Sequence, residues 1–375
     1  MRGAPILAAL GLIGCGRVGV PSITNDAMPQ MPPDHAPDAP PYPAAICSVT
    51  RVLVAATPAV ADLAVAPVSE GYAAIWVDTA APKAAQGLLL GPNLQFLTAR
   101  ALPEIQDLAL GGIADVGQKL VLASATGTTQ KLNILGRDLT MLSVQDTLVR
   151  RLMGRDPYPS DANGLPHAFV SAEPRQLVVS NVADDGLVDP AFATHGVPGT
   201  ITELACSDGP NHGHCVWAET LPSPDSYQCT ISDVYFNRPA PAVPSTIAWP
   251  NYCAEVRNAS GPVSADSMIV VWTTQTHAVE ARYAVSTGDK LATIAPMGFA
   301  PKVTFDGRRF WIAYLDGNRL LRLASFDLNG TIVDYSLAGW TPLGSEAFEL
   351  VHREPSATSL VVLSAGELDF LTICP

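Results

Sequence analysis

Apolar residues in this chain occur in short runs separated by Gly, Pro, Asp and Asn, without a convincing stretch of helical periodicity. One run of similar character appears seven times. The seven copies are Ala73–Asp78, Lys119–Ser124, Gln176–Asn181, His214–Glu219, Met268–Thr273, Arg309–Tyr314 and Ser359–Ser364. Short apolar runs bounded by turn-forming residues are typical of β-strands, so the pattern predicts an all-β body built from repeats.

The spacing of the runs indicates the size of the repeat. Successive runs begin 38 to 57 residues apart, which is close to the roughly 40–50 residues of a four-stranded propeller blade. A single four-stranded sheet can bury both faces only when neighbours stack against it around a ring. We therefore predict a β-propeller of seven four-stranded blades over residues 46–375. A large β-sandwich and a six-bladed ring with an irregular insertion are the alternatives.

The clearest single repeat covers residues 302–337. Four strand-like runs are separated there by turns at 306–307, 316–318 and 329–330, which read Asp-Gly, Asp-Gly-Asn and Asn-Gly. These pairs tolerate the positive φ that tight hairpin turns need. In architecture alone, the repeat-built body resembles the propeller bodies of exported bacterial lipoproteins, although the WD and kelch signatures are absent.

The two ends of the body predict how the ring closes. The last repeat ends after three strand-like runs, and one extra run, 46–56, precedes the first complete repeat. Antiparallel pairing of this N-terminal strand beside the final run would complete the last blade and bring Cys47 near Cys374. A disulfide between them would stabilise the fold by about 4–6 kcal/mol in the chain-entropy model.

The first residues resemble an export signal. Arg2 precedes an apolar stretch from Ala4 to Ile13, which is followed by Gly14 and Cys15. This is the order of charged, apolar and small residues in a secretory signal, and the apolar stretch is too short to span a bilayer. Leu12-Ile13-Gly14-Cys15 resembles the lipobox of bacterial lipoproteins. The resemblance implies cleavage before Cys15 and lipidation of its thiol, whereas a cleaved signal with an incidental cysteine is the alternative.

The same resemblance implies a destination. In lipoproteins of two-membrane bacteria, a residue other than Asp after the cysteine usually implies transfer to the outer membrane, and here that residue is Gly16. Eight prolines stand between residues 16 and 45. Because proline fixes φ and lacks a donor N–H, this stretch is predicted to be an extended tether; a proline-rich ligand for another protein is the alternative. The predicted organisation is a signal peptide (1–14), a lipidated tether (15–45) and a propeller (46–375).

Composition limits the expected partners. The chain has 375 residues, of which 48% are hydrophobic and 15% charged, and its formal net charge is −13. Such a chain can bury a large core, and its acidic surface repels phosphate backbones. We therefore expect no nucleic-acid partner, a membrane contact through the lipid, and a protein or glycan as ligand.

The cysteine count fits an exported protein. Without Cys15 six cysteines remain, and an even number in an oxidising compartment favours three disulfides. These six are Cys47, Cys206, Cys215, Cys229, Cys253 and Cys374. Besides the pair at the two ends of the body, the simplest local pairings are Cys206 with Cys215 and Cys229 with Cys253.

A metal site is the alternative for one of these pairs. Cys206 and Cys215 stand beside His212 and His214, and thiolate and imidazole are ligands that suit zinc. The oxidising destination and the absence of C-x-x-C spacing favour the disulfide. We therefore predict no metal.

The sequence carries no signature of catalysis. The GxSxG, HExxH, P-loop, dinucleotide and calcium-loop motifs are all missing. We therefore predict no catalytic residue and no cofactor, and a non-enzymatic binding module as the function. A hydrolase or lyase acting on extracellular polysaccharide with carboxylates at the channel mouth is the alternative. An assembly factor for outer-membrane proteins is a third possibility.

One connection between repeats is a candidate ligand contact. Residues 148–164 contain Arg150, Arg151, Arg155 and Tyr158, in a chain that has only 22 basic residues. The segment is longer than a turn requires, and arginine matches carboxylate and phosphate groups. Because connections between blades emerge on the face where propeller ligands commonly dock, we predict that these side chains contact an anionic group or acidic glycan. A solvated loop whose arginines pair with nearby acids is the alternative.

Overall fold

The chain folds into antiparallel β-sheets. The computed structural model describes residues 45–54, 59–79, 84–116, 119–126, 129–147, 167–173, 175–182, 193–209, 212–221, 228–237, 240–241, 245–248, 254–260, 268–284, 290–327, 329–337, 339–353 and 357–374. These residues contain 28 strands and no helix. Accordingly, no helix in the described ranges is long and apolar enough to cross a lipid bilayer.

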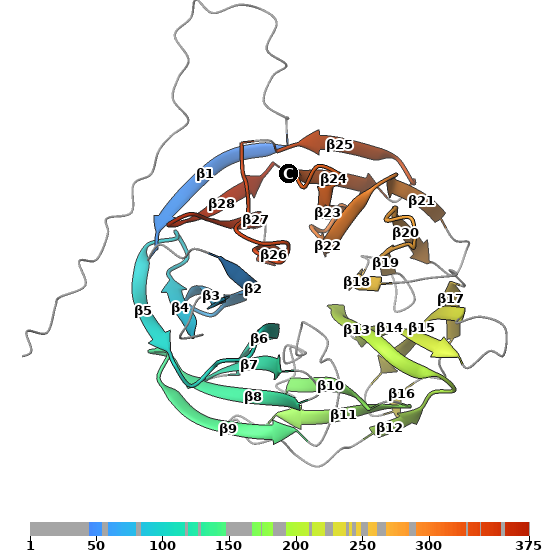
Figure 1. Ribbon diagram of the computed structural model, residues 1–375, viewed down its shortest axis with the longest axis horizontal. Helices are drawn as coiled ribbons and strands as arrows, with labels where there is room; N and C mark the ends of the chain where they lie inside the picture. Colours follow the sequence, from blue (N-terminus) through green and yellow to red (C-terminus); the bar gives the residue numbers. More distant parts are fainter. Residues whose placement is uncertain are drawn as a thin grey trace, which may run out of the picture.

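The described strands form seven sheets that follow one another around a ring (Figure 1), which confirms the predicted β-propeller. Four of these sheets consist of four consecutive strands. The first has β2 (Val60–Val68), β3 (Gly71–Asp78), β4 (Ala85–Leu90) and β5 (Phe96–Leu102); the second has β6 (Ala109–Val116), β7 (Lys119–Thr126), β8 (Thr129–Gly136) and β9 (Met141–Thr147). The fifth has β18 (Ala254–Ser260), β19 (Met268–Thr273), β20 (Val279–Ala284) and β21 (Lys290–Ala295); the sixth has β22 (Gly298–Phe305), β23 (Arg309–Asp316), β24 (Leu321–Asp327) and β25 (Ile332–Ser336).

Two sheets depart from the predicted four strands. The third has β10 (His167–Glu173), β11 (Gln176–Val182) and β12 (Ala193–Gly196). The fourth has β13 (Thr200–Gly209), β14 (His212–Leu221), β15 (Gln228–Asn237), β16 (Ala240–Pro241) and β17 (Ser245–Ala248). Both β16 and β17 pair with β15, so two short strands share the place of a fourth. Pro241 in β16 has no N–H for the ladder, which limits the pairing of this short strand.

The seventh sheet contains both ends of the described chain. It comprises β26 (Phe348–Arg353), β27 (Ala357–Ser364), β28 (Glu367–Ile373) and β1 (Ile46–Leu53), in the order β1-β28-β27-β26. Strand β1 pairs antiparallel with β28, with Ile46 opposite Ile373. The predicted closure of the last blade by the N-terminal strand is therefore confirmed.

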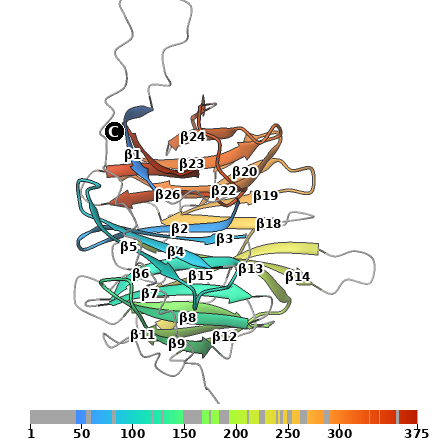
Figure 2. The same ribbon diagram turned by 60° about the vertical axis from the view of Figure 1, so that its left-hand side comes forward.

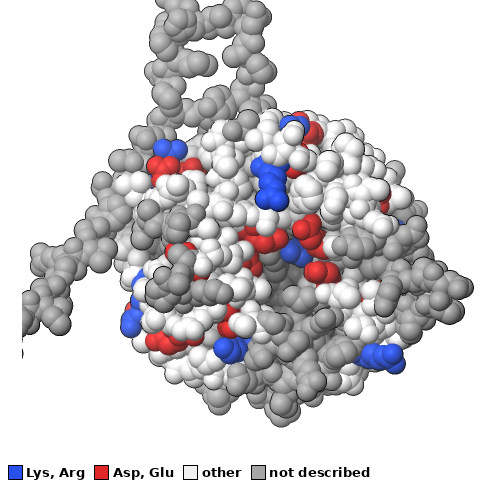
Figure 3. Space-filling view, viewed as in Figure 1, with Lys and Arg blue, Asp and Glu red and all other residues white. Residues whose placement is uncertain are grey.

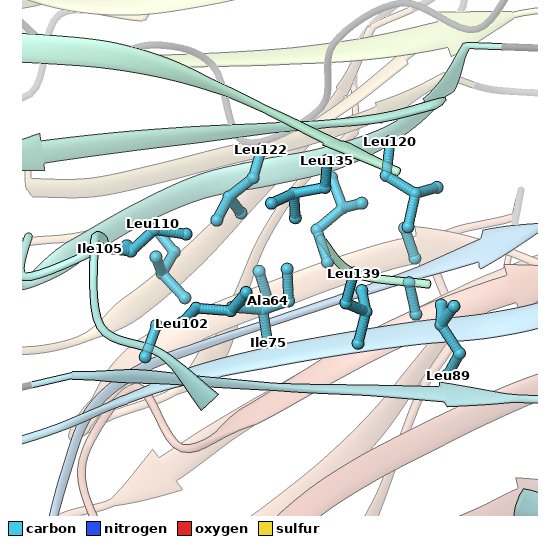
Figure 4. Packing of buried hydrophobic residues seen from close by; sticks show 14 of the residues in the cluster. Ala64, Ile75, Leu89, Leu102, Ile105, Leu110, Leu120, Leu122, Leu135 and Leu139 are labelled. Carbon is cyan, nitrogen blue, oxygen red and sulfur yellow. The ribbon is translucent and has the colours of Figure 1, made fainter. Parts of the chain in front are cut away.

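The hydrophobic core lies between the sheets, which pack face to face (Figure 2). One cluster joins the first and second sheets: Leu102 and Ile75 contribute from one side, and Leu122 and Leu135 from the other (Figure 4). Another joins the seventh sheet to the first through Phe370 and neighbouring buried residues. Each of the seven repeated runs lies in a different sheet, on β3, β7, β11, β14, β19, β23 or β27. These runs are apolar because both faces of the strand contact a neighbouring sheet.

A disulfide joins the two edges of the seam, as the sequence predicts. The Cys47 and Cys374 sulfurs lie 2.11 Å apart, and the two Cα atoms are 5.1 Å apart. The Cys374 N–H donates to the carbonyl of Ala45 at 2.7 Å. Farther along the strand, the Arg51 Nε lies 3.0 Å from an oxygen of Asp369.

One turn conformation recurs at hairpins in different sheets. In each, the fourth residue has a positive φ: Leu94 (60°), Leu139 (62°), His277 (61°), Arg319 (62°) and Gly330 (86°). The prediction for the turn at 316–318 was wrong in one detail. The sequence indicated that the positive φ would fall within the Asp-Gly-Asn segment, whereas the residue with the positive φ is Arg319. The Asp316 carboxylate holds this turn by accepting from the N–H groups of Asn318 and Leu320, at 2.8 and 3.0 Å. These hydrogen bonds to Asp316 stabilise the turn although a non-glycine residue, Arg319, has the left-handed conformation.

Replacing both seam cysteines, Cys47→Ser with Cys374→Ser, should lower the free energy of unfolding by about 2–5 kcal/mol, because the bond spans 327 residues and constrains the unfolded chain. Urea unfolding followed by tryptophan fluorescence measures the change. Reduction of the unaltered protein should give at least this loss, because it also breaks the disulfide of Cys215. Equal stability of the oxidised and reduced forms would contradict the assignment of this bond as the main constraint on the seam.

Candidate functional site

The candidate site is the end of the ring at which the innermost strands begin. Strands β2, β6, β13, β18, β22 and β26 are the strands of their sheets that lie nearest the centre of the ring (Figure 1). In chain order, the connections between successive sheets lead into these strands at their first residues. On the face drawn in Figure 3, acidic side chains gather around a hollow near the middle of the ring.

Irregular pairing marks the beginning of most innermost strands. The register shifts near the start of β2, β6, β13, β18 and β22. Two non-glycine residues in these bulges, Glu255 and Ala300, have φ values of 52° and 50°. Bulges of this kind redirect side chains and leave backbone groups outside the ladder. Each bulge therefore needs an additional hydrogen-bond partner.

Carboxylates from neighbouring sheets supply these partners. The Asp62 carboxylate on β2 accepts from its neighbour Leu63 N–H at 2.9 Å and from Leu110 N–H on β6 at 2.8 Å. The Glu255 carboxylate on β18 accepts from Ala300 N–H on β22 at 2.8 Å. The same oxygen accepts from the Thr273 hydroxyl at 2.7 Å. One acid thus connects the first and second sheets, and another connects the fifth and sixth.

Ion pairs make further connections around the ring. Lys302 on β22 is fully buried and pairs with Glu346, which precedes β26. The carbonyl of Glu346 accepts from Leu63 N–H on β2 at 3.1 Å, so this residue contacts both neighbouring sheets. Arg257 on β18 lies 3.9 Å from the Glu203 carboxylate on β13. Together with Asp62 and Glu255, these groups form what we call the inter-blade joints.

A buried polar network occupies the corresponding end of the second sheet. The Asp107 carboxylate accepts from the Ser124 hydroxyl at 2.5 Å and also from Thr126. The Lys131 ammonium lies 3.5 Å from the same carboxylate, and the Asn133 amide donates to the Ser124 oxygen at 2.8 Å. Hydroxyl, amide and cation thus stabilise one carboxylate in place of bulk water.

The hydrogen bonds and ion pairs of the inter-blade joints indicate the chemical role of these acids. Each carboxylate that we have placed at this end binds a backbone N–H, a hydroxyl or a cation of the scaffold. Glycoside hydrolysis requires instead a pair of carboxyl groups facing a bond of the substrate. The geometry of these acids therefore fits a role in holding the sheets together.

The tryptophans of the repeated runs, Trp76, Trp217, Trp272 and Trp311, are all buried and belong to the core. The His277 ring packs against Phe299 at 4.9 Å between ring centres. In β26, the His352 Nδ1 lies 2.8 Å from the Thr358 hydroxyl.

The predicted ligand loop and part of the cysteine assignment remain predictions. Arg150, Arg151, Arg155 and Tyr158 lie outside the described residues. The same holds for Cys15 and Cys253.

The central pair of cysteines is better defined. The ladder between β13 and β14 sets Cys206 opposite Cys215, and Cys215 is disulfide-bonded. Among the residues that the structure describes, no group of three or more His, Cys, Asp or Glu could hold a metal ion. Cys229 lies in β15.

The inter-blade joints were missed at the level of sequence, although a signal is present. An acidic residue stands 11 to 13 positions before five of the seven repeated runs: Asp62, Asp107, Glu203, Glu255 and Glu346. Each of these positions lies within three residues of the first residue of an innermost strand. A recurrent acid at a fixed distance from a recurrent strand indicates a repeated structural contact, so alignment of the repeats could have found it.

Comparison with known proteins finds only distant structural neighbours. No family model and no curated protein matches this sequence. Among solved structures, the β-propeller domain of the Trilobed protease from Pyrococcus furiosus is 8% identical, with a TM-score of 0.49 over 84% of this chain and 95% of that chain. AofleA from Arthrobotrys oligospora is 10% identical, with a TM-score of 0.49 over 77% and 90%. An acylaminoacyl peptidase from Pyrococcus horikoshii is 8% identical, with a TM-score of 0.46 over 84% and 53%.

The substitution Asp62→Ala should destabilise the ring by about 1–3 kcal/mol, because it leaves the Leu110 N–H without its acceptor at a buried position and removes one of the two acceptors of the Leu63 N–H. Chemical denaturation gives the free energy of unfolding. Glu104→Ala, which removes an exposed acid from the same region, is the matched control and should change stability by less than about 0.5 kcal/mol. If both variants lose the same amount, the joint does not stabilise the ring.

Proposed function

We propose that this chain is an exported, lipid-anchored β-propeller that acts as a binding module for a protein or glycan. The disulfide between Cys47 and Cys374 is the observation that carries the proposal. Disulfides form and persist mainly in oxidising compartments and are rare in the reducing cytosol. A second bonded cysteine, Cys215, supports the same environment.

The sequence before the ring supplies the proposed anchor. Leu12-Ile13-Gly14-Cys15 resembles a lipobox, and Gly16 follows the cysteine as in lipoproteins of the outer membrane. Several acyl chains on one residue make a stable anchor, whereas a single chain binds a membrane only marginally. The proline-rich residues 16–45 then separate the lipid from the ring.

The inter-blade joints support a binding role for the ring. Their acids stabilise contacts between sheets and so provide a rigid frame on which connecting loops are displayed. Rigid elements limit the conformational entropy that a binding surface loses when it meets its ligand. Within this proposal, Arg150, Arg151, Arg155 and Tyr158 form the part of the loop surface that contacts an anionic group.

The anchor is tested by Cys15→Ser in a bacterial host that is fed an alkyne analogue of palmitate. The unaltered chain should incorporate the analogue and fractionate with the outer membrane, because its thiol carries the lipid. The Cys15→Ser variant should lose the label. Cys374→Ser removes a cysteine of the ring and should keep it. Equal labelling of Cys15→Ser and the unaltered chain would refute the anchor.

The ligand surface is tested with polygalacturonate, a polymer of carboxylated sugars, as the probe. Reversing the charge of Arg150, Arg151 and Arg155 to Glu should lower its affinity at least tenfold, because arginine pairs with carboxylate. The matched control reverses the charge of Arg175, Arg308 and Arg319, which are exposed in the described structure. It changes net charge equally and should have a much smaller effect. A probe that does not bind the unaltered chain, or equal losses in both variants, would contradict this surface.

A further inference from the structure

The chain from the proposed anchor enters the ring at its seam. Strand β1 begins at Ile46, and the disulfide lies at the next residue, Cys47. We propose that this disulfide acts as a mechanical clasp: it carries the tension in the tether and so prevents this tension from pulling β1 away from the ring. The inference rests on the proposed lipid anchor, because only a tethered chain experiences such tension.

Without the disulfide, the seam would be open to peeling. Strand β1 stands at the edge of its sheet and β28 is its neighbour there. Tension at the N-terminal end of β1 would act first on the pairing of Ile46 with Ile373, and next on that of Ser48 with Thr372. Hydrogen bonds loaded one after another give way singly, and each contributes only about 0.5–1.5 kcal/mol net. A strand held by these bonds alone would open progressively from its loaded end.

The position of the disulfide removes this weakness. Cys47 adjoins the first loaded pair, so the covalent bond takes up tension before the rest of β1 does. Its partner, Cys374, directly follows β28, which is paired with β1 on one side and with β27 on the other. The bond therefore transfers the load to a strand inside the sheet. Residues 48–373 also lie within the covalent loop that the bond closes.

The ion pairs that join β1 to β28 lie at the other end of the seam. Arg51 contacts Glu367 at 3.1 Å and Asp369 at 3.0 Å. Beyond the strand, Val54 N–H donates to the carbonyl of Gly366 at 3.0 Å. Peeling from Ile46 would reach these contacts last, so they cannot protect the loaded end. At the loaded end, the Ile46 and Ile373 side chains supply apolar packing, and the disulfide adds a covalent link there.

The clasp can be tested by stretching single molecules in an optical trap. The sample is the chain from Gly16 onward, made in an oxidising host, with one handle at its N-terminus and the other inserted at the exposed turn around Asn318. The oxidised molecule should show no extension step before the whole ring unfolds. After a reductant is added to the same molecule, a step on the order of 30–50 Å should appear at low force, as β1 and the segment after it are released. Cys47 is exposed, so the reductant can reach the bond.

Two variants separate the clasp from general weakening of the seam. Arg51→Gln weakens the pairing of β1 with β28 but keeps the disulfide, so the oxidised form should still show no early step. The double substitution Cys47→Ser with Cys374→Ser should show the step without reductant. An early step in the oxidised unaltered chain, or its absence after reduction, would overturn the proposal. Because this experiment uses no lipid, its outcome is independent of the palmitate labelling that tests the anchor.

Discussion

Closure of the ring is the constraint on which the rest of the structure depends. Every sheet has two apolar faces, and each face is buried only when another sheet lies against it. The cluster between the seventh and first sheets shows this directly, because it contains Phe370 from one and Tyr72 from the other. These two rings meet edge to face at 5.4 Å between their centres. An open ring would expose two apolar faces, so the pairing of β1 with β28 stabilises both sides of the seam.

Burial accounts for cohesion between the sheets, whereas polar contacts define their positions at the inner ends. Apolar packing is not directional, and it tolerates small displacements of one sheet relative to the next. A hydrogen bond from Leu110 N–H to Asp62, or from Ala300 N–H to Glu255, has a specific geometry. The buried pair of Lys302 and Glu346 adds a contact that is costly to break, because either charge alone would be left in a desolvated position. The joints thus fix how five pairs of neighbouring sheets meet.

The acids of the inter-blade joints show that charge composition alone does not reveal whether an acidic residue is catalytic or structural. A net charge of −13 and a hollow surrounded by acids would fit an acid–base active site as well as a scaffold. Hydrogen bonding distinguishes the two, because a carboxylate whose oxygens accept from the backbone is committed to the fold. Asp62 and Glu255 accept from backbone N–H groups, and Asp107, Glu203 and Glu346 contact hydroxyls or cations of the scaffold. The proposed binding function therefore does not depend on these acids.

Much of the architecture could be predicted from the sequence by itself. Seven apolar runs, Asp-Gly and Asn-Gly turns and a surplus strand at the N-terminus are local patterns, and they sufficed for an all-β ring closed by Cys47 and Cys374. Tertiary structure decided which acid of one sheet meets which N–H of another, that Arg319 adopts the left-handed conformation, and that the fourth sheet divides its outer strand. These depend on contacts between residues distant in sequence, or on competition between local conformations. Hydrophobic periodicity records which residues are buried, but it carries no information on which buried groups face each other.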